Sequence, residues 1–486
     1  MPALAQEASV GGRGLTVETS FTAASTYTEL RGTSVDGSRL GSELITQFGP
    51  GLRLRSRAGR VQGTLDYTLL ATVHARRTDF NTLTNNLTGN LRAELVPGWA
   101  YVDGTASAGQ QAATVYGLQQ TQGSLRSNEN LRETTSVSLS PYIRGNAFGF
   151  ADYEFRLFGA TTDVRGATDG DSTNLVATQT LRSRLGPRLG WALQSSQQRV
   201  DFRAGRPTDL FRTTASLSFA PDPDLVFTAR AGEERTDIGS DFRRRYSTWG
   251  GGVRWTPSPR TSFSLDADRR FFGDAYQLVL EHRMRRTAVR FSSVRDSTSG
   301  TDANGVGQPI TLLQLYLLQF ASIEPDPVLR EQRVREFLRL TNQDPGSLVS
   351  GGLASSAVSL QQRNDLSVSY AGLRTTFTAQ AFSSSTRVID RQIEAQGDRI
   401  RQVGATFSAN HRLTPISNAS VGLSYLRSLD PAPLQPRSDQ TTLSLGYTTT
   451  LSRQVTGSLT ARYSLFDGAP FSNRETSVTA SVNVRF

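Results

Sequence analysis

The last eleven residues of the chain, 476–486, alternate between apolar and polar side chains without a break. Because successive side chains of a β-strand point to opposite faces, one face of this segment is apolar and the other is polar. The apolar face consists of Val478, Ala480, Val482, Val484 and Phe486. One face therefore suits lipid and the other suits water. The alternative is an ordinary edge strand that happens to end at Phe486, because period-two strands are common in soluble sheets.

This tail resembles the C-terminal assembly signal of bacterial outer-membrane β-barrels, in which insertion machinery reads a strand that ends in Phe. Composition agrees with a barrel, since only 37% of the 486 residues are hydrophobic and a barrel needs one apolar face per strand. No segment approaches the roughly 18 consecutive apolar residues of a transmembrane helix. Cysteine is absent, which excludes disulfides and thiolate metal sites, and we expect neither a metal nor a cofactor.

Period-two runs recur along nearly the whole chain, and their connections alternate between short turns, such as 145–146 and 411–415, and long polar links, such as 113–130. Membrane barrels show this alternation, with short periplasmic turns and long outer loops. Counting back from Phe486 gives seven strands, and counting forward from Leu15 gives about fifteen. We therefore predict an all-β fold, a closed antiparallel transmembrane β-barrel of about 22 strands (range 18–22), in the outer membrane of a Gram-negative bacterium.

Residues 14–486 are expected to form this single barrel, interrupted by one short helical insertion at about 309–342. Residues 1–13 precede the first strand. Within them, Ala3-Leu4-Ala5 has the small-x-small form of a signal-peptidase site, although the charged and apolar regions of a signal peptide are missing. We interpret 1–13 as the segment that follows the cleavage region; an accidental match in an Ala-rich chain is the alternative.

The insertion begins with the apolar run 310–320, which is too short to cross a bilayer as a helix. Asp326 then offers an N-cap oxygen, and Pro327 fits the first position of a second helix. The buried stripe predicted for this helix consists of Val334, Phe337 and Leu338. Strand parity places the insertion on the outer side, where so apolar a segment should not stand in water. We expect it to plug the lumen or to pack against a neighbouring barrel; a pair of buried strands is the alternative.

The insertion and the strand after it resemble a known family, the outer-membrane β-barrel proteins associated with PEP-CTERM and exosortase systems. The resemblance rests on residues 321–330 (ASIEPDPVLR), 334–338 (VREFL) and 372–377 (GLRTTF), and on the closing Phe486. It covers most of the C-terminal half of the chain. It implies an outer-membrane location and a link to exopolysaccharide export, and it supplies no catalytic residues.

Other classes of function find little support in the sequence. The formal charge is +10, but the arginines are scattered, so we expect no nucleic-acid partner. His74, His282 and His411 sit in no motif with a nucleophilic serine, and His411 lies in a predicted turn, so we expect no enzyme. A barrel enzyme that acts on lipid or polysaccharide stays an alternative. An energy-coupled transporter would carry a large N-terminal plug domain, whereas strand pattern starts by Leu15.

The remaining functions are a porin-like channel, passive or helix-gated, or a scaffold that retains surface polysaccharide. Parity turns many charged side chains inward, and an excess of arginine over carboxylate favours anions. The pore-lining candidates are Arg92, Arg156, Arg182, Arg212, Arg230, Arg254, Asp266, Asp268 and Arg270. Solvated or mutually paired wall residues are the alternative for each of them. The expected partners are outer-membrane lipid and lipopolysaccharide, the barrel-assembly machinery, and an anionic oligo- or polysaccharide.

Overall fold

The computed structural model describes most of the chain. The described ranges are 14–32, 41–56, 59–112, 131–147, 149–166, 170–183, 188–298, 358–389, 399–429, 437–468 and 471–486. Between them, the described residues of the insertion are Leu313, Tyr316, Leu317, Phe320, Arg330, Glu331, Val334, Arg335 and Leu338.

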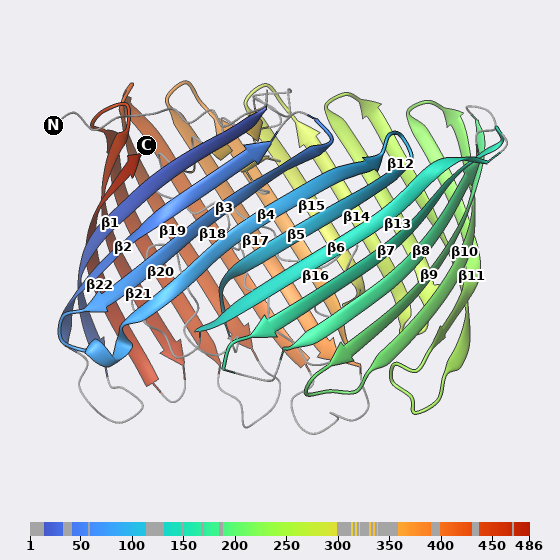
Figure 1. The fold of residues 1–486 in the computed structure, drawn as a ribbon, viewed down its shortest axis with the longest axis horizontal. Helices are drawn as coiled ribbons and strands as arrows, with labels where there is room; N and C mark the ends of the chain where they lie inside the picture. Colours follow the sequence, from blue (N-terminus) through green and yellow to red (C-terminus); the bar gives the residue numbers. More distant parts are fainter. Residues whose placement is uncertain are drawn as a thin grey trace.

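Within these ranges, 22 strands form one antiparallel sheet in which each strand pairs with the next along the chain (Figure 1). Both Leu15 and Phe486 lie at one rim, which we call the terminal rim, and the opposite rim is the loop rim. The strands that run toward the loop rim are β1 (Leu15–Gly32), β3 (Val61–His74), β5 (Ala100–Ala112), β7 (Ala151–Val164), β9 (Leu189–Phe202), β11 (Leu225–Thr236), β13 (Thr261–Arg270), β15 (Thr287–Thr298), β17 (Thr375–Val388), β19 (Ser417–Leu429) and β21 (Val455–Gly468). The strands that return are β2 (Ser42–Ser56), β4 (Thr82–Val96), β6 (Leu131–Ala147), β8 (Ser172–Ser183), β10 (Thr208–Asp222), β12 (Arg244–Ser258), β14 (Gly273–Arg283), β16 (Ser359–Ala371), β18 (Arg399–Thr414), β20 (Ser438–Thr450) and β22 (Phe471–Arg485). A 3₁₀ turn, η1 (Thr78–Phe80), lies between β3 and β4.

The last strand closes the sheet against the first. The register of β22 on β1 runs from Ser20 opposite Arg485 to Gly32 opposite Asn473. The backbone N–H of Phe486 extends the seam by donating to Thr19 O at 2.9 Å, while the Phe486 side chain is 74% exposed. Closure satisfies the backbone groups that an open edge would leave unpaired in lipid. The predicted closed barrel of about 22 strands is confirmed.

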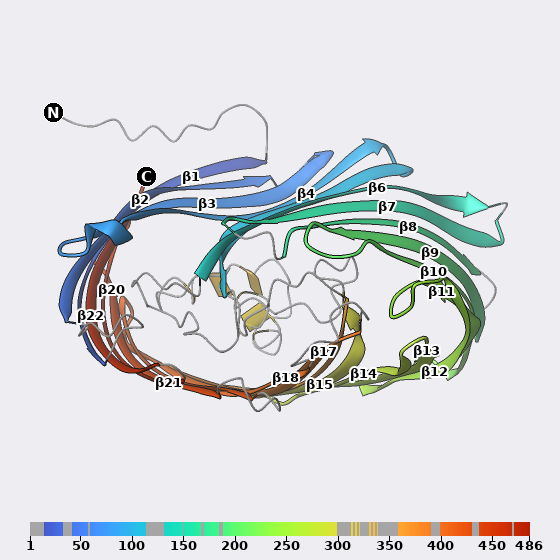
Figure 2. The ribbon, with the colours of Figure 1, turned by 90° about the horizontal axis from the view of Figure 1, so that it is seen from below.

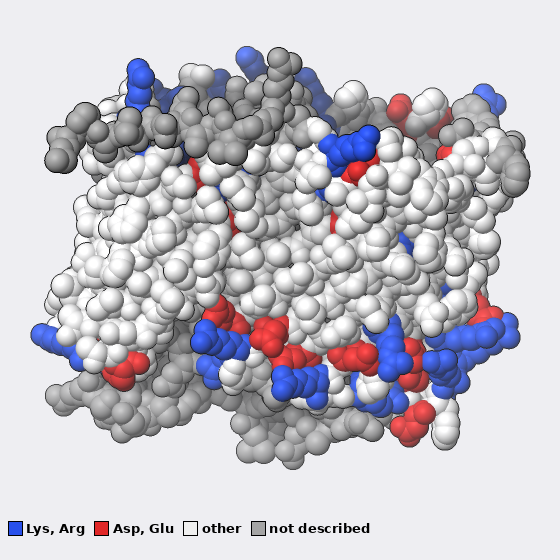
Figure 3. All heavy atoms as spheres, in the orientation of Figure 1, with Lys and Arg blue, Asp and Glu red and all other residues white. Residues whose placement is uncertain are grey.

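The outer surface of the barrel is apolar. On β4, for example, the outward residues Leu83, Leu91 and Leu95 are exposed, as in other strands whose inward neighbours are polar. On the face that Figure 3 shows, charged side chains gather near the two rims, most densely at the loop rim, and leave an uncharged belt between them. Such a belt is the lipid-facing surface of a transmembrane barrel. No helix among the described residues is long and apolar enough to cross a bilayer.

Some predicted turns were misplaced. β6 continues through 145–146 to Ala147, and β18 continues through His411 to Thr414. Pro415 ends β18, since proline cannot donate to the ladder, and the turn is reduced to two residues. On the loop rim, Phe271 and Phe272 alone join β13 to β14, so the alternation of short and long connections fails there. His411 is therefore a strand residue; its Nδ1 lies 2.7 Å from Thr375 Oγ1.

The described residues of the insertion are helical and lie inside the ring of strands (Figure 2). Tyr316, Val334 and Leu338 form a buried apolar cluster, against which Leu313, Leu317 and Phe320 pack. The rings of Tyr316 and Phe320 meet edge to face with centroids 6.3 Å apart. Residues from both halves of the insertion thus pack on each other within the lumen.

Candidate functional site

All nine predicted pore-lining residues lie on the inward face of their strands. Each alternates with outward residues; Arg92 follows the exposed Leu91, and Arg254 precedes the exposed Trp255. Registers agree across strands, since Gly252 lies opposite Asp266 and Gly250 opposite Asp268. The structure divides the nine residues among a cluster on β4–β7, a network on β10–β15, and two arginines outside both.

The cluster on β4–β7 is built around Asp103, a carboxylate that the candidate set missed. Arg92 Nε lies 2.8 Å from Asp103 Oδ1, and Arg156 Nη1 lies 3.2 Å from Asp103 Oδ2. Arg156 also binds Glu154 at 3.0 Å. Both predicted arginines thus bind the carboxylate of Asp103, and Asp103 and Glu154 together neutralise much of their charge.

The same cluster contains a stack of aromatic rings and guanidinium groups near the terminal rim. The rings of Tyr101 and Tyr142 are stacked, with centroids 5.1 Å apart and an interplanar angle of 16°. The guanidinium carbon of Arg156 lies 3.8 Å from the Tyr142 ring centroid, and that of Arg144 lies 4.5 Å from the Tyr101 ring centroid. Stacking holds guanidinium groups in fixed positions. Inward parity was the sequence signal for Tyr101, Tyr142 and Arg144, which the candidate set also missed.

On β10–β15, which we call the paired wall, arginines bind carboxylates across intervening strands. Arg230 on β11 has Nη1 2.6 Å from Asp266 Oδ1 and Nε 2.9 Å from Asp268 Oδ1, although both aspartates lie on β13. β12 stands between them, and its Gly250 and Gly252 make room. A Cβ on Gly250 would lie 2.0 Å from Asp268 Oδ1, and one on Gly252 would lie 2.4 Å from Asp266 Oδ1. The missing side chains of these two glycines allow the Arg230 side chain to cross β12.

The paired wall continues toward the loop rim through Glu234, another carboxylate that the candidate set missed. Arg270 Nε lies 2.8 Å from Glu234 Oε1, and Arg270 also binds Asp296 of β15. Arg212 lies 3.6 Å from Glu234 and 3.5 Å from Asp268. Every arginine of this network therefore has carboxylate partners within the wall itself.

Arg182 on β8 and Arg254 on β12 stand outside both groups. Within the described part of the chain, neither side chain makes a hydrogen bond or an ion pair. Of the predicted set, these two arginines present charge to the lumen without a partner carboxylate.

The insertion is bound to the inward face of β2 and β3 through two charged residues. Arg335 Nη1 lies 3.2 Å from Asp66 Oδ2 on β3. Arg335 Nε also lies 2.8 Å from Glu331 Oε1, one helical turn earlier, and Glu331 in turn lies 3.7 Å from Arg55 Nη2 on β2. The sequence did not single out either residue of the insertion, because its partners are about 270 positions away in the chain.

The contacts of the insertion extend a chain of ion pairs on the wall. Asp66 also binds Arg53 of β2, whose Nη1 lies 3.5 Å from Glu18 Oε2 on β1. Positive and negative groups alternate along the whole series. We call the inward face that carries Glu18, Arg53, Arg55 and Asp66 the docking wall.

Part of the predicted plug stripe lies in the described residues. Val334 and Leu338 are buried with no exposed surface and belong to the apolar cluster inside the lumen. Asp326, Pro327 and Phe337 lie outside the described residues.

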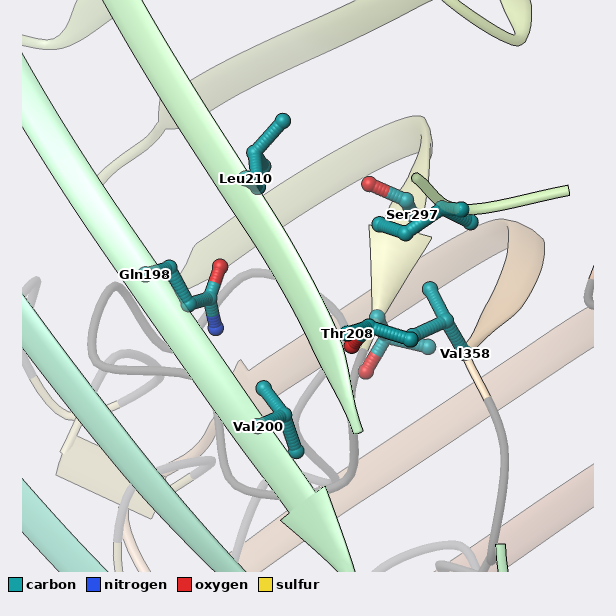
Figure 4. A pocket seen from close by; sticks show the side chains of 8 residues that line it. Gln198, Val200, Thr208, Leu210, Ser297 and Val358 are labelled. Atoms are coloured by element: carbon teal, nitrogen blue, oxygen red, sulfur yellow. The ribbon is translucent and has the colours of Figure 1, made fainter. Parts of the chain in front are cut away.

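At the loop rim, an apolar seam joins opposite sides of the barrel. Val200 and Phe202 of β9 pack with Ile238, which follows β11, and with Val358, which precedes β16. Figure 4 shows Val200, Leu210 and Val358 around a cavity of about 20 Å³ at this seam. A cavity of that size holds at most about one water molecule. The mouth above the paired wall is therefore narrowed by tightly packed apolar side chains.

Comparisons with known proteins concern the fold. No family model and no curated protein matches the sequence. Among solved structures, a mutant of the ferric enterobactin receptor PfeA from Pseudomonas aeruginosa aligns over 96% of this chain and 80% of its own, with 9% identity and a TM-score of 0.46. OpdK from the same organism, solved with vanillate, aligns over 97% and 99%, with 9% identity and a TM-score of 0.35. OccAB1 from Acinetobacter baumannii aligns over 97% of both chains, with 10% identity and a TM-score of 0.35.

Proposed function

We propose that the protein is a porin-like channel of the Gram-negative outer membrane, with a lumen occluded by its helical insertion. The closed barrel and its apolar belt support a membrane location. The observation that carries the occlusion is the ion pair of Arg335 with Asp66, which ties the insertion to the inside of the wall. The insertion buries its apolar side chains in one cluster and pairs its charged side chains with the wall, which suits a segment that contacts a polar lumen.

Burial along the docking wall supports the same proposal. In a wide water-filled barrel, inward side chains stay partly exposed, as Arg92 does with 63% of its side-chain surface. On the docking wall, where the insertion binds, the side chains of Arg55 and Asp66 are only 18% and 28% exposed. The insertion covers this side of the lumen, so ions pass either when the insertion moves away or along the opposite side.

The ion pairs of the insertion are weak enough to release. Partly exposed pairs contribute about 0.2–1 kcal/mol each, and connected networks contribute more. Free energies of this size allow docked and undocked states to interconvert, and salt weakens the docked state because it screens the pairs. We therefore propose a helix-gated channel in which the docked insertion is the low-conductance state.

We propose a preference for anions, carried by Arg182 and Arg254. Arginines that are paired with wall carboxylates add little net field to the lumen, whereas an unpaired guanidinium attracts anions. Reversal potentials in a salt gradient test this preference. The proposal fails if the intact channel selects cations.

A role in exopolysaccharide export is a further proposal, and it derives from the family resemblance of the insertion. If the permeant is an anionic oligosaccharide, micromolar to millimolar additions should interrupt the current from one side. A scaffold that retains surface polysaccharide would bind such chains without conducting. A barrel enzyme is disfavoured because, within the described residues, the His282 and His411 rings contact threonine hydroxyls, and no serine hydroxyl binds a histidine.

The deciding experiment is planar-bilayer conductance of the full chain beside a variant that lacks about 308–342. The proposal predicts a higher conductance for the variant, provided that heat-modifiable mobility shows a folded barrel. Equal conductance of two folded barrels would favour the scaffold.

A further inference from the structure

A groove of about 400 Å³ lies on the outward surface of β1–β6. It lies nearer the terminal rim, because its lining includes Leu15 at the start of β1, Ser56 at the end of β2 and Val61 at the start of β3. Its sides are formed by the side chains of Leu15, Leu54, Val61, Leu65 and Leu91. The groove opens on the lipid-facing side of the barrel, outside the lumen described above.

Glycines on three strands form the floor of the groove. A Cβ on Gly63 would lie 2.3 Å from Asn90 O, and one on Gly89 would lie 2.9 Å from a methyl group of Leu65. Gly104 is different, since the nearest atom to its Cβ position is 3.7 Å away, at ordinary contact distance. The neighbours of Gly63 and Gly89 leave no room for a Cβ at these positions, whereas a Cβ at Gly104 would meet only ordinary contacts, so the floor of the groove stays free of side chains.

The polar groups near the floor are already bonded. Thr64 donates both its backbone N–H and its hydroxyl to Asn90 Oδ1, at 3.0 and 3.1 Å. The hydroxyls of Thr105 and Ser138 are 2.7 Å apart. The surface left facing outward is therefore hydrocarbon, and its occupant has to be hydrocarbon as well.

The arginine side chain of Arg60 lies at the terminal-rim end of the groove. Arg60 is exposed in the turn that directly precedes Val61, and within the described ranges its side chain has no ion pair or hydrogen bond. An apolar groove inside the membrane belt with a free guanidinium at its mouth matches one acyl chain and the phosphate of a phospholipid. We propose that this groove is a binding site for a phospholipid of the inner leaflet, with one acyl chain over Gly104 and the phosphate at Arg60.

A second copy of the chain fits the groove less well. A two-fold contact would place the same patch on both subunits, so the two Arg60 side chains would approach each other. Like charges at such a contact are unfavourable, and a convex barrel wall cannot enter a narrow hollow. A flexible acyl chain meets neither obstacle.

The test is native mass spectrometry of the full-length protein after detergent washing, followed by titration with phosphatidylglycerol or phosphatidylethanolamine micelles. Gly104→Leu fills the groove without a backbone clash, and Ala229→Leu adds the same side chain to the outward face of β11 as a control. We expect wild type and Ala229→Leu to retain one phospholipid, and Gly104→Leu to lose affinity for it roughly tenfold. Arg60→Gln should keep the lipid but reduce the preference for phosphatidylglycerol.

Equal lipid retention by Gly104→Leu and wild type would overturn the site. A dimeric wild type that becomes monomeric in Gly104→Leu, with no change in bound lipid, would overturn it in favour of a contact between copies. The inference rests on the membrane location in the proposed function and not on conduction. Bilayer currents of Gly104→Leu should therefore match wild type, which separates failure of this site from failure of the channel.

Discussion

The docking wall on β1–β3 and the paired wall on β10–β15 are both lined by alternating arginines and carboxylates, but their partners have different origins. On the paired wall, Arg230 and Arg270 bind carboxylates two strands away, which the sheet holds in place. On the docking wall, Asp66 shares its charge between Arg53 of the wall and Arg335 of the insertion. One network lies wholly within the barrel wall, and the other includes residues of the insertion.

This difference separates two properties of a channel. A network that is fixed by strand register sets a constant field along the lumen and favours selectivity without gating. A network that includes the insertion couples occlusion to ion pairs that salt and substitution can weaken. Substitutions on the two walls should therefore change different observables.

The largest effect is expected from deletion of about 308–342. Removing the insertion should raise single-channel conductance severalfold, because it uncovers the side of the lumen where Arg335 and Glu331 contact Asp66 and Arg55. Ion selectivity should change little, since the paired wall is intact. A deletion variant with lower conductance than wild type would show that the insertion supports the pore instead of occluding it.

Substitution of the link itself should have the next largest effect. Arg335→Ala removes contacts to both Asp66 and Glu331, worth about 1 kcal/mol for a partly exposed network, so the open fraction should rise about fivefold. Arg230→Ala is the matched control, since it removes two similar ion pairs on the paired wall. Single-channel recordings measure the open fraction of each variant. An equal change in both variants would show that the two walls do not differ in their effect on gating.

The glycines of β12 provide a reciprocal test. Gly252→Val should displace Asp266 from Arg230, because the added Cβ lies within 2.4 Å of the carboxylate oxygen. The freed guanidinium should strengthen anion preference, and overpacking should lower stability by about 1–3 kcal/mol. The reversal potential measures the change in anion preference, and the midpoint of urea unfolding measures the change in stability. An unchanged reversal potential in a folded variant would mean that this ion pair lies outside the conducting path.

The smallest effect is expected at the unpaired arginines. Arg182→Gln and Arg254→Gln should each reduce anion preference by a few millivolts of reversal potential at low salt, and the difference should fade near 1 M salt, where the Debye length is about 3 Å. Arg156→Gln is the control, because Arg156 is paired with Asp103 and Glu154. A larger shift for Arg156→Gln than for Arg254→Gln would reverse the assignment.

Much of the fold follows from the sequence because a membrane strand repeats every two residues. Counting seven strands back from Phe486 and fifteen forward from Leu15 reproduces the observed β16–β22 and β1–β15. Parity alone also turned all nine charged candidates inward. His411, which the sequence predicts to lie in a turn, is a strand residue because β18 continues to Thr414 and only Pro415 ends it.

The partners of those residues do not follow from parity. Arg230 reaches β13 across β12, which depends on register and on the missing side chains of Gly250 and Gly252 together. Glu234 and Asp296 neutralise arginines that, taken one by one, indicate an anion-selective pore. The contact of Arg335 with Asp66 joins distant parts of the chain, and no local pattern marks either residue. The sequence therefore predicts on which face of its strand a residue lies, whereas its ion-pair partner depends on three-dimensional packing.

The most direct test of the account uses the absence of cysteine from the chain. Asp66→Cys and Arg335→Cys introduced together can be joined by a short bis-methanethiosulfonate cross-linker, which forms a disulfide with each thiol as sulfinate leaves and so replaces the ion pair with a reducible covalent link. In one reconstituted channel, the account predicts a low, steady current while the link is intact and a rise to frequent opening after reduction. A current that is the same before and after reduction would contradict it, because the insertion would then not have to leave the docking wall for ions to pass.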